Sequence, residues 1–362
     1  MAGSADDVAW MARALALAER GRHTSRPNPM VGCVLVRDGA VVADGWHERA
    51  GGPHAEVAAL TRAGDRAAGA TAYVTLEPCN HHGRTGPCSE ALLAAGVSRV
   101  VYGLADPNPA AAGGGARLRA AGVEVAGGLL APWVAEQNRV FLHGLSHRRP
   151  HVTLKLAQTV DGALVAPAGR WITGPAARAA VHRERARADA VLVGSGTVLA
   201  DDPRLDVRGV PAPGGQPRAV VLDARGRTPV DAAVVRPGTI VVTGPGAPAD
   251  HRVELTNAGV EVVTVPAGAP AGVDLDAALA ALWDRGIRAI LAEPGATLAA
   301  ALMRAGVVDR LLRHVAGSMM AIDGTPRPAA AVATGAAWPV RRQVPRGDDL
   351  EIETVPTVEE AA

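Results

Sequence analysis

Apolar positions in the first part of the chain follow the periods of helices and strands. Residues 8–20 place apolar side chains at helical spacing, and Gly21 follows where a helix would end. Residues 31–36 and 40–45 are apolar runs that flank Asp38-Gly39, a dipeptide that favours the type I′ turn of a β-hairpin. Further along, the pattern predicts helices at 55–62, 89–96 and around 116–121, and strands at 71–76, 97–104 and 123–128. Strands separated by short helices are typical of a layered α/β domain.

A polar stretch closed by a proline, residues 143–150, marks the expected boundary between two domains. The near-continuous apolar strands beyond it are typical of a mostly parallel central sheet. We therefore expect one domain over residues 1–147 and a second α/β domain over residues 148–362. The second is predicted to have strands at 151–160, 189–195, 218–223, 238–244, 259–266 and 287–293, helices at 175–188, 274–285 and 296–305, and weaker strands toward the C-terminus.

Composition narrows the classes of function. The 362 residues are 48% apolar, enough to bury the cores of two domains. The 37 basic and 36 acidic residues nearly cancel, which argues against binding nucleic acid or an anionic membrane through bulk charge. No stretch has the roughly 20 uninterrupted apolar residues of a membrane span, and acidic residues stand where a secretory signal would be basic and then apolar. We therefore expect a cytoplasmic protein.

The strongest chemical signal is one histidine and two cysteines, His54, Cys79 and Cys88. Such a set suits a catalytic zinc ion, whose fourth tetrahedral position is left for water. Glu56 could shuttle the proton of this water, provided that a helix begins at the motif and turns both side chains into one cleft. The pattern H-x-E followed by P-C and a later C is typical of zinc-dependent nucleobase deaminases, in which the glutamate moves protons to the departing ammonia.

Other interpretations of these residues remain open. A structural zinc site would need a fourth protein ligand, which His81 or His82 could supply, and a non-enzymatic zinc-binding module would give Glu56 no role. A nucleic-acid-editing deaminase would need a basic groove with aromatic side chains, whereas the chain has two tyrosines, one phenylalanine and balanced charge. Cys33 lies inside an apolar strand and is expected to be a core residue.

The segment between the two cysteines, Asn80 to Pro87, is longer than the two residues found in most deaminases of this kind. Its arginine, histidines, glycine and threonine are well suited to hold a phosphate. A nucleotide-like substrate is therefore favoured over a free base or a nucleoside.

Three segments that include these residues resemble the deaminase half of the bifunctional riboflavin-biosynthesis deaminase/reductase family. They are PNPMVGCV, AGGPHAEVAAL and GATAYVTLEPCNHHGRTGPCSEALLAAGVSRVVYGLADPNP. The resemblance covers nearly all of residues 8–145. On their own, the asparagines of the two Pro-Asn-Pro segments are more simply explained as turn residues. The resemblance implies instead that the pyrimidine and the ribose phosphate are held by Asn28, His47, His81, Arg84 and Asn108.

The second half contains no G-x-G-x-x-G turn after a strand, so the pattern does not support a Rossmann nucleotide site. The segment Glu293-Pro294-Gly295-Ala296-Thr297 is a glycine-containing turn between a buried strand and a helix. Such a turn can bind an anion, but many contain glycine for packing alone. The lone lysine of the chain, Lys155, lies on the first strand, where it could contact cofactor or substrate or be structural.

Three segments of the second half resemble the reductase half of the same family, namely VTLKLAQTVDG, WITGPAAR and VGSGTVLADDPRLDVR. The resemblance implies a cytidine-deaminase-like three-layer α/β domain followed by a dihydrofolate-reductase-like domain, which uses NADPH to reduce the ribose to a ribityl chain. The implied cofactor contacts are Ala157, Trp171, Thr197, Asp201, Gly295, Ala296 and Thr297. The implied substrate contacts are Arg185, Leu205, Arg208 and Glu293, with Lys155 as a further candidate.

Some segments depart from the family pattern. The glycine-rich turn is Glu293-Pro294-Gly295 here, and proline removes one backbone N–H that could hold a phosphate. An active deaminase with a degenerate, scaffold-only reductase-like domain is therefore the alternative to a bifunctional enzyme. Under either hypothesis the expected partners are Zn²⁺ and a small phosphoribosylaminopyrimidine substrate. We expect neither nucleic acid nor membrane as a partner, and we expect a homo-oligomer.

Overall fold

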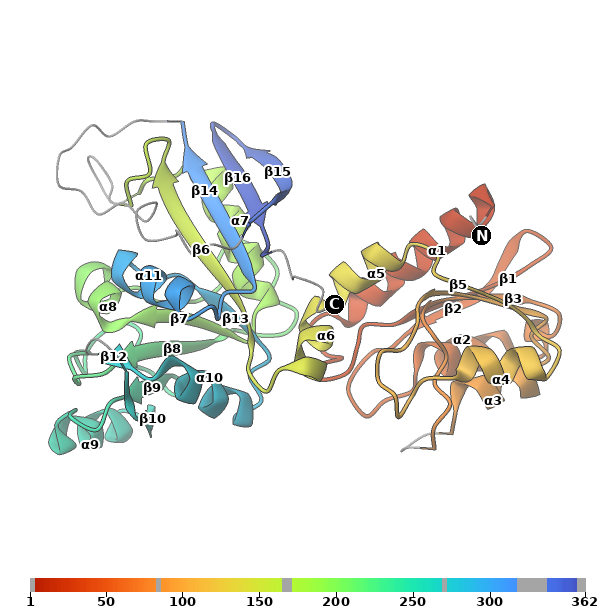
Figure 1. Cartoon of the computed structure of the whole chain (residues 1–362), viewed down its shortest axis with the longest axis horizontal. Helices are drawn as coiled ribbons and strands as arrows, with labels where there is room; N and C mark the ends of the chain where they lie inside the picture. The colour runs from red at the N-terminus through yellow and green to blue at the C-terminus, as the bar shows by residue number, and fades with distance from the viewer. Residues whose placement is uncertain (1–3, 83–85, 165–170, 269–271, 318–336, 357–362) are drawn as a thin grey trace. The chain divides into compact units, whose positions relative to one another are not determined.

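The computed structural model describes residues 4–82, 86–164, 171–268, 272–317 and 337–356. By their internal contacts they group into two compact units, Met1–Ser146 and His147–Ala362 (Figure 1). Each unit has its own central sheet and its own cores.

The first unit is built on a five-stranded sheet with the order β2-β1-β3-β4-β5. β1 pairs antiparallel with β2 and β3, and the remaining pairs, β3 with β4 and β4 with β5, are parallel. The hairpin turn between β1 and β2 has positive φ at Asp38 (52°) and Gly39 (72°), as a type I′ turn requires. The strands are β1 (Gly32–Arg37), β2 (Ala40–Trp46), β3 (Thr71–Leu76), β4 (Arg99–Leu104) and β5 (Glu124–Gly127).

Helices cover both faces of this sheet, which makes the expected three-layer α/β domain (Figure 1). On one face α1 packs on β1 and β3, and α5 packs on β4. On the other face the small side chains of α2, together with Leu92 of α3 and Leu118 of α4, join Cys33 and Leu35 of β1 in a second core. Cys33 is fully buried there, as predicted for a core cysteine. The helices are α1 (Ala5–Ala18), α2 (Ala55–Ala63), α3 (Cys88–Ala94), α4 (Gly114–Ala120), α5 (Ala131–Gln137) and α6 (Arg139–Ser146), with short 3₁₀ turns at Glu19–Gly21 and Gly64–Ala67.

Two features of these helices differ from the prediction. α1 begins before residue 8 because the Ser4 side chain accepts from the backbone N–H of Asp7 and the Asp7 carboxylate accepts from that of Ser4, which closes a capping box. α5 and α6 were not predicted. They meet at Asn138, whose amide group donates to Met30 O and accepts from Met30 N. This tertiary contact is invisible to helical periodicity.

The second unit is built on a nine-stranded sheet with the order β10-β9-β8-β7-β13-β6-β14-β16-β15. All neighbours from β10 to β14 are parallel, as predicted, and the last two strands add antiparallel. The strands are β6 (His151–Thr159), β7 (Ala190–Gly194), β8 (Arg218–Asp223), β9 (Ile240–Thr243), β10 (Glu261–Thr264), β13 (Ala289–Ala292), β14 (Arg310–Ala316), β15 (Val340–Arg346) and β16 (Asp349–Thr354), and β11 (Ala267–Gly268) pairs with β12 (Gly272–Val273) in a separate ribbon.

Alternate residues of the parallel strands enter two cores, one on each face of the sheet. Leu192 of β7 packs with side chains of α10 and α11, whereas its neighbours Val191 and Val193 pack with Val198 of α8 and Leu255 of α9. α8 and α9 were not predicted. The helices are α7 (Pro175–Arg187), α8 (Ser195–Asp201), α9 (Ala249–Asn257), α10 (Leu275–Asp284) and α11 (Ala296–Arg304).

The last strands of the second unit carry buried ion pairs. Arg310 of β14 contacts Glu184 and Glu353, and Glu351 of β16 contacts His314 and Arg346. Burial alone would raise the pKa of Glu351, but the hydrogen bonds from His314 and Arg346 lower it to about 2.

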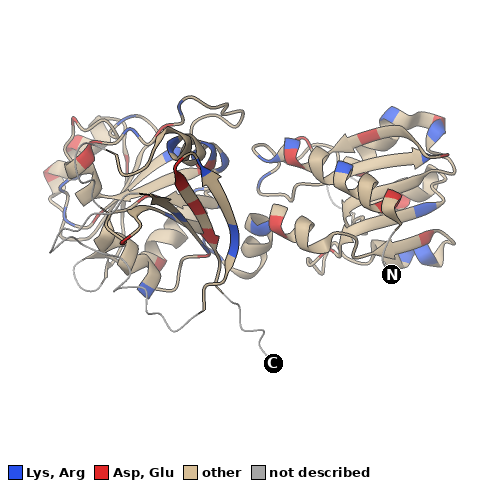
Figure 2. Ribbon diagram, turned by 90° about the horizontal axis from the view of Figure 1, so that it is seen from above, with Lys and Arg blue, Asp and Glu red and all other residues tan. Residues whose placement is uncertain are grey.

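Elsewhere, basic and acidic side chains are interspersed over both units (Figure 2). Among the described residues, no helix combines the length and the apolar character needed to cross a membrane.

Candidate functional site

The three predicted zinc ligands come from three places in the first unit. His54 is the N-cap of α2, with extended backbone, and Cys88 is the first residue of α3, directly after Pro87. Cys79 follows the end of β3 by three residues. The backbone N–H of Cys88 donates to Cys79 Sγ at 3.3 Å, and that of Ser89 donates to Cys79 O at 3.2 Å, so the start of α3 is tied to the Cys79 segment.

The geometry of these three side chains fits a zinc ion. His54 Nδ1 lies 3.2 Å from Cys88 Sγ and 3.5 Å from Cys79 Sγ, and all three ligand atoms lie within 4.8 Å of one another. Ordinary zinc–sulfur and zinc–nitrogen lengths at the tetrahedral angle would separate such atoms by roughly 3.5 to 3.8 Å. The hydrogen bond between the two thiols lowers the pKa of Cys79 to about 4 and raises that of Cys88 well above its ordinary value. Before a metal binds, Cys79 is therefore the thiolate and Cys88 keeps its proton, which a metal would displace.

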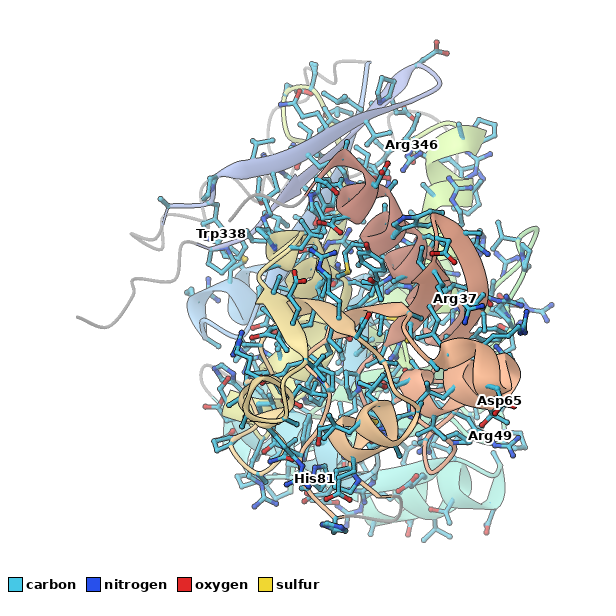
Figure 3. All side chains as sticks on the ribbon, turned by 90° about the vertical axis from the view of Figure 1, so that its right-hand side faces the viewer. Arg37, Arg49, Asp65, His81, Trp338 and Arg346 are labelled. Carbon is cyan, nitrogen blue, oxygen red and sulfur yellow. The ribbon has the colours of Figure 1, made fainter. Side chains whose placement is uncertain are left out.

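No fourth protein ligand completes this cluster within the described part of the chain. His81 and His82, the candidates for a structural site, are both exposed. His81 projects from the segment between β3 and α3 (Figure 3), and His82 lies 3.7 Å from Glu90. The arrangement is therefore that of a three-ligand site with an open position.

Glu56 lies in the first turn of α2, two residues after His54. The helix begins at this motif, as required for both side chains to enter one cleft. Burial raises the pKa of Glu56 to about 7, although the nearby His54 lowers it. A carboxyl group that ionises near neutrality can both accept and release a proton.

A chain of hydrogen bonds brings two predicted substrate residues to the same place. His47 Nδ1 donates to Pro53 O at 2.9 Å, which leaves its Nε2 to accept from Asn28 Nδ2 at 3.1 Å. The rings of His47 and His54 meet edge to face with centroids 5.7 Å apart. Asn28 therefore does more than occupy a turn, because its side chain fixes a histidine beside the zinc cluster.

For the remaining predicted substrate residues within the described part of the chain, the structure shows no contact with the zinc-ligand cluster. The Asn108 side chain accepts from Ala110 N at 3.2 Å, and the backbone N–H of Asn108 donates to Asp106 Oδ1 at 2.9 Å, which is the hydrogen bonding of a turn residue. Arg84 lies outside the described residues.

One residue of this region was missed by the sequence analysis. Glu77 is buried, and its carboxylate accepts from the backbone N–H groups of Asp106 at 3.1 Å and Gly115 at 2.9 Å. It thereby joins the Pro78-Cys79 segment to the loop that carries Asn108. Its place in the Glu-Pro-Cys motif was visible, but its partners become neighbours only in the fold.

The second unit contains a cavity of about 1290 Å³ at the carboxyl ends of its parallel strands, where ligands bind in open α/β sheets. Every predicted cofactor residue lines this cavity. So do all the predicted reductase substrate residues except one. Those that line it are Lys155, Ala157, Trp171, Arg185, Thr197, Asp201, Arg208, Glu293, Gly295, Ala296 and Thr297.

Leu205 is the exception. Its side chain is 1% exposed and packs with Val191 and Val198 in the core on one face of the sheet. In this conformation the Leu205 side chain therefore does not contact a substrate in the cavity. The backbone at Leu205 has φ of 55°, in the left-handed region, and Arg208, three residues later, lines the cavity.

An ion-pair cluster forms one wall of the cavity. Arg185 Nε donates to Glu293 Oε1 at 2.6 Å, and Lys155 Nζ lies 3.9 Å from Glu293 Oε2. Burial lowers the pKa of Lys155, and the carboxylate of Glu293 partly offsets this effect. The lysine therefore faces the cavity and is held by a carboxylate, which is compatible with a contact to cofactor or substrate.

The turn after β13 contacts the first turn of α8, the helix that directly follows β7. Gly295 N donates to Thr197 Oγ1 at 3.2 Å, and α11 begins directly after Gly295. Pro294 removes one N–H, but the turn still borders the cavity. The sequence analysis also missed five basic side chains of the cavity wall, namely Arg178, His182, Arg225, Arg227 and Arg304.

Comparisons with known proteins match both units. Residues 4–104 match the cytidine and deoxycytidylate deaminase zinc-binding region, and residues 150–321 match the RibD C-terminal domain. The riboflavin biosynthesis protein RibD of Escherichia coli is 43% identical over 332 residues, covering 88% of this chain and 89% of that protein. The RibD of Mycobacterium tuberculosis is 43% identical over 314 residues, covering 83% and 84%.

Solved structures agree over nearly the whole chain. RibD of Acinetobacter baumannii has a TM-score of 0.83 at 38% identity and covers 98% of this chain and 99% of its own. A diaminohydroxyphosphoribosylaminopyrimidine deaminase/5-amino-6-(5-phosphoribosylamino)uracil reductase of Thermotoga maritima has a TM-score of 0.82 at 30% identity and covers 97% and 99%. The chain thus belongs to the RibD family of riboflavin biosynthesis, as a bifunctional enzyme that joins a zinc-binding cytidine-deaminase-like domain to an NADPH-using, dihydrofolate-reductase-like domain.

Proposed function

We propose that residues 1–147 hydrolytically deaminate 2,5-diamino-6-(5-phosphoribosylamino)pyrimidin-4(3H)-one to 5-amino-6-(5-phosphoribosylamino)uracil. Residues 148–362 then reduce the ribosyl group of this product to a ribityl group with NADPH. The observation that carries the proposal is the open His54, Cys79, Cys88 cluster with Glu56 buried beside it. In support, the Thermotoga maritima relative is named as a deaminase of diaminohydroxyphosphoribosylaminopyrimidine and a reductase of 5-amino-6-(5-phosphoribosylamino)uracil.

In the deaminase reaction, zinc held by His54, Cys79 and Cys88 would activate water for attack on the amidine carbon of the pyrimidine. Glu56 is the only carboxylate in the first turn of the helix that carries His54. It takes a proton from the water and delivers one to the departing amino group, which leaves as ammonia. The burial of Glu56 helps, because it brings the proton affinity of the carboxylate close to what both transfers require.

Substrate recognition in the first unit is assigned to Asn28, His47, His81, Arg84 and Asn108. His47 is held with a defined orientation by Pro53 O and Asn28, at the edge of the His54 ring. The exposed His81 and the turn at Asn108 lie on the two segments that Glu77 joins. Such an arrangement suits a substrate with a flat ring at the cluster and a charged phosphate toward solvent.

In the reductase reaction, the protein aligns the nicotinamide with C1 of the ribose. Opening of the ribosylamine to its imine makes this carbon electrophilic, and NADPH when bound supplies the hydride. The Lys155, Glu293, Arg185 cluster orients the sugar, and Arg208 binds its phosphate. Ala157, Trp171, Thr197, Asp201 and the turn from Gly295 to Thr297 hold the cofactor.

A scaffold-only second domain is not favoured. Its cavity is formed, and it retains the charged cluster that a scaffold would not need. The family match over residues 150–321 and the coverage of RibD structures point the same way.

A coupled assay of the purified protein tests the division into two activities. Ammonia release and NADPH oxidation are recorded separately from the diaminopyrimidine substrate, and then NADPH oxidation alone from the deaminated product. Removal of zinc by a chelator should stop ammonia release and leave the reduction of deaminated product unchanged. Loss of both activities on chelation would contradict two separate sites, and absence of NADPH oxidation with deaminated product would restore the scaffold interpretation.

We also place the protein in the cytoplasm as a homo-oligomer, in keeping with its expected small-molecule substrate. Light scattering coupled to size-exclusion chromatography measures the oligomeric state. A monomer at micromolar concentration would contradict this part of the proposal.

A further inference from the structure

We propose that His182 is a positioning residue of the reductase reaction, which holds the backbone of Arg208 so that this arginine meets the phosphate of the deaminated substrate. The inference rests on the proposed reductase function of the second unit and on the phosphate contact assigned there to Arg208. His182 lies on α7 and lines the cavity, but neither a sequence motif nor the resemblance singled it out.

Arg208 lies in a segment, residues 202–208, that forms neither helix nor strand. Such a segment has no regular ladder of backbone hydrogen bonds, so its backbone polar groups need other partners. Gln216 supplies two of them, because its Oε1 accepts from Val207 N at 2.6 Å and its Nε2 donates to Val207 O at 3.2 Å. Both backbone polar groups of the residue before Arg208 are thus paired with one side chain.

Two side chains of α7 hold the residues on either side of Val207. Arg185 Nη1 donates to Asp206 O at 2.9 Å. His182 Nδ1 accepts from Arg208 N at 3.2 Å. His182 and Arg185 are three residues apart and therefore lie on the same face of the helix. This face carries one donor and one acceptor, which match the carbonyl and the N–H that the segment presents.

Arg185 connects these contacts to the ion-pair cluster of the cavity wall. Its Nε donates to Glu293 Oε1 at 2.6 Å, while its Nη1 holds Asp206 O. The Asp206 carboxylate in turn contacts the Arg208 guanidinium. One face of α7 therefore sets the position of Arg208 relative to the cluster that orients the sugar. That position matters, because a sugar phosphate has a fixed length and both of its ends must be aligned for hydride transfer.

The contact with Arg208 N requires a neutral imidazole at His182. A ring nitrogen that accepts a hydrogen bond carries no proton, so Nε2 holds the proton of the neutral ring. Burial lowers the pKa of His182, and the positive charges around it lower the pKa further, against the effect of Glu293. Those charges are Arg185 of the same helix, Arg208 of the held segment and Lys155 of β6. The acceptor is therefore present at neutral pH and is lost only as the pH falls below the ordinary histidine value of 6.5.

A direct contact between His182 and the phosphate is the rival assignment. An imidazolium ion in the cavity wall would attract the phosphate, so the substrate would bind more tightly at low pH. Positioning predicts the opposite, because protonation of Nδ1 breaks the hydrogen bond from Arg208 N. The structure favours positioning, since Nδ1 is already used by Arg208 N and the positive neighbours disfavour the imidazolium ion.

The first test measures kcat and KM for the deaminated product at saturating NADPH. His182→Leu removes the acceptor, so KM should rise by roughly fivefold or more, while kcat and the KM for NADPH change little. His182→Asn places an amide oxygen near the position of Nδ1 and should restore most of the affinity. Arg183→Ala is the matched control, because Arg183 is the exposed neighbour on the same helix, and its KM should not change.

A double-mutant cycle shows whether His182 acts through Arg208. Arg208→Ala removes the side chain that His182 positions, so the addition of His182→Leu should raise KM no further. A purely structural role of His182 would instead make the two effects add.

The dependence of KM on pH gives an independent measurement. Between about pH 7.5 and about pH 5.5, the KM of the unsubstituted protein should rise more steeply than that of His182→Asn, which has no imidazole to protonate. The substrate phosphate also gains a proton near pH 6, but it affects both proteins equally, so the difference between them reports His182.

Three outcomes would overturn the proposal. One is an additive double variant, and another is a KM that His182→Asn fails to restore. The third is a KM that falls at low pH in the unsubstituted protein relative to His182→Asn, which would favour direct phosphate binding. Failure of the proposed function is distinct, because the unsubstituted protein would then oxidise no NADPH with the deaminated product.

Discussion

The two units of this protein differ in how far apart in the sequence the residues of each site lie. In the first unit the ligand cluster comes from residues 54–88, and two of its three ligands stand at the start of helices. In the second unit the cavity is lined by residues from 155 to 304, at the ends of strands that are neighbours only in the sheet. A cluster whose residues lie in short motifs can be predicted from the sequence. A cavity whose residues come from the ends of several strands becomes visible only in the fold.

The largest expected effect concerns Glu56. Glu56→Gln keeps the size of the side chain but removes its ability to take a proton, so ammonia release should fall by roughly 10²- to 10⁴-fold. Zinc content and the reduction of deaminated product should not change. Ammonia release from the diaminopyrimidine substrate and metal analysis of the purified variant measure both.

The matched control is Glu90→Gln. Glu90 stands two residues after Cys88, as Glu56 stands two after His54, but it is partly exposed and paired with Arg117. This variant should retain ammonia release. Deamination that survives in Glu56→Gln, or is lost equally in both variants, would contradict the role assigned to Glu56.

A smaller effect is expected from Arg208→Ala in the second unit. Loss of a phosphate contact should raise KM for the deaminated product by roughly tenfold and leave ammonia release unchanged. Arg204→Ala is the control, because Arg204 also pairs with Asp206 but is not part of the cavity wall. If both half-reactions weakened together in Arg208→Ala, the separation of the two sites would be wrong.

Gly114→Ala probes the packing behind the zinc cluster. A Cβ at Gly114 would lie 1.8 Å from Pro78 O, next to Cys79. Overpacking of this kind typically costs about 1 to 3 kcal/mol, so the melting temperature of the first unit should fall and zinc should bind less tightly. Differential scanning calorimetry and a zinc titration measure these changes. Gly246→Ala, where a Cβ meets nothing within 4 Å, should be nearly neutral, and equal effects of the two would contradict the packing argument.

The smallest expected effect is a dependence of stability on pH in the second unit. The pKa of Glu351 is about 2 in the fold and about 4.5 ordinarily, so its stabilising interactions are fully present above the higher value. They are lost as the pH falls through the lower value. Urea unfolding at about pH 5 and about pH 3 should show a smaller loss of unfolding free energy in Glu351→Gln than in the unsubstituted protein. Equal losses would show that Glu351 is not a source of this dependence.

Elements that depend on local interactions were predicted from the sequence, whereas elements that depend on contacts with distant residues were missed. The hairpin at Asp38-Gly39 and the helix at residues 55–62 were expected from local patterns and are present. α5 and α6 were missed because the contact at their junction is to Met30, far away in the chain. α8 and α9 were missed because their apolar faces are short, with Val198 and Leu255 reaching the core.

The candidate sites show the same division. For the zinc cluster, residue types and spacing were enough, because few side chains suit a zinc ion. For the cavity, the resemblance named a minority of the lining residues, and it did not name basic residues such as His182 and Arg304, which no motif marks. Leu205 was named as a substrate residue, yet its side chain lies in the core. Whether a leucine faces a cavity or a core depends on its tertiary neighbours, which here are Val191 and Val198.

The sequence by itself indicated the layered α/β architecture, the three candidate zinc ligands that the fold brings together, and the family of the chain. These follow from local periodicity and from chemistry that permits few residue types at a few positions. The tertiary structure alone decided which charges meet, such as Arg185 with Glu293, and which basic side chains line the cavity. The physical reason is that ion pairing depends on the distance between two charges in space. In a parallel sheet, neighbouring strands are often far apart in the sequence, so the order of residues does not reveal which charges are close.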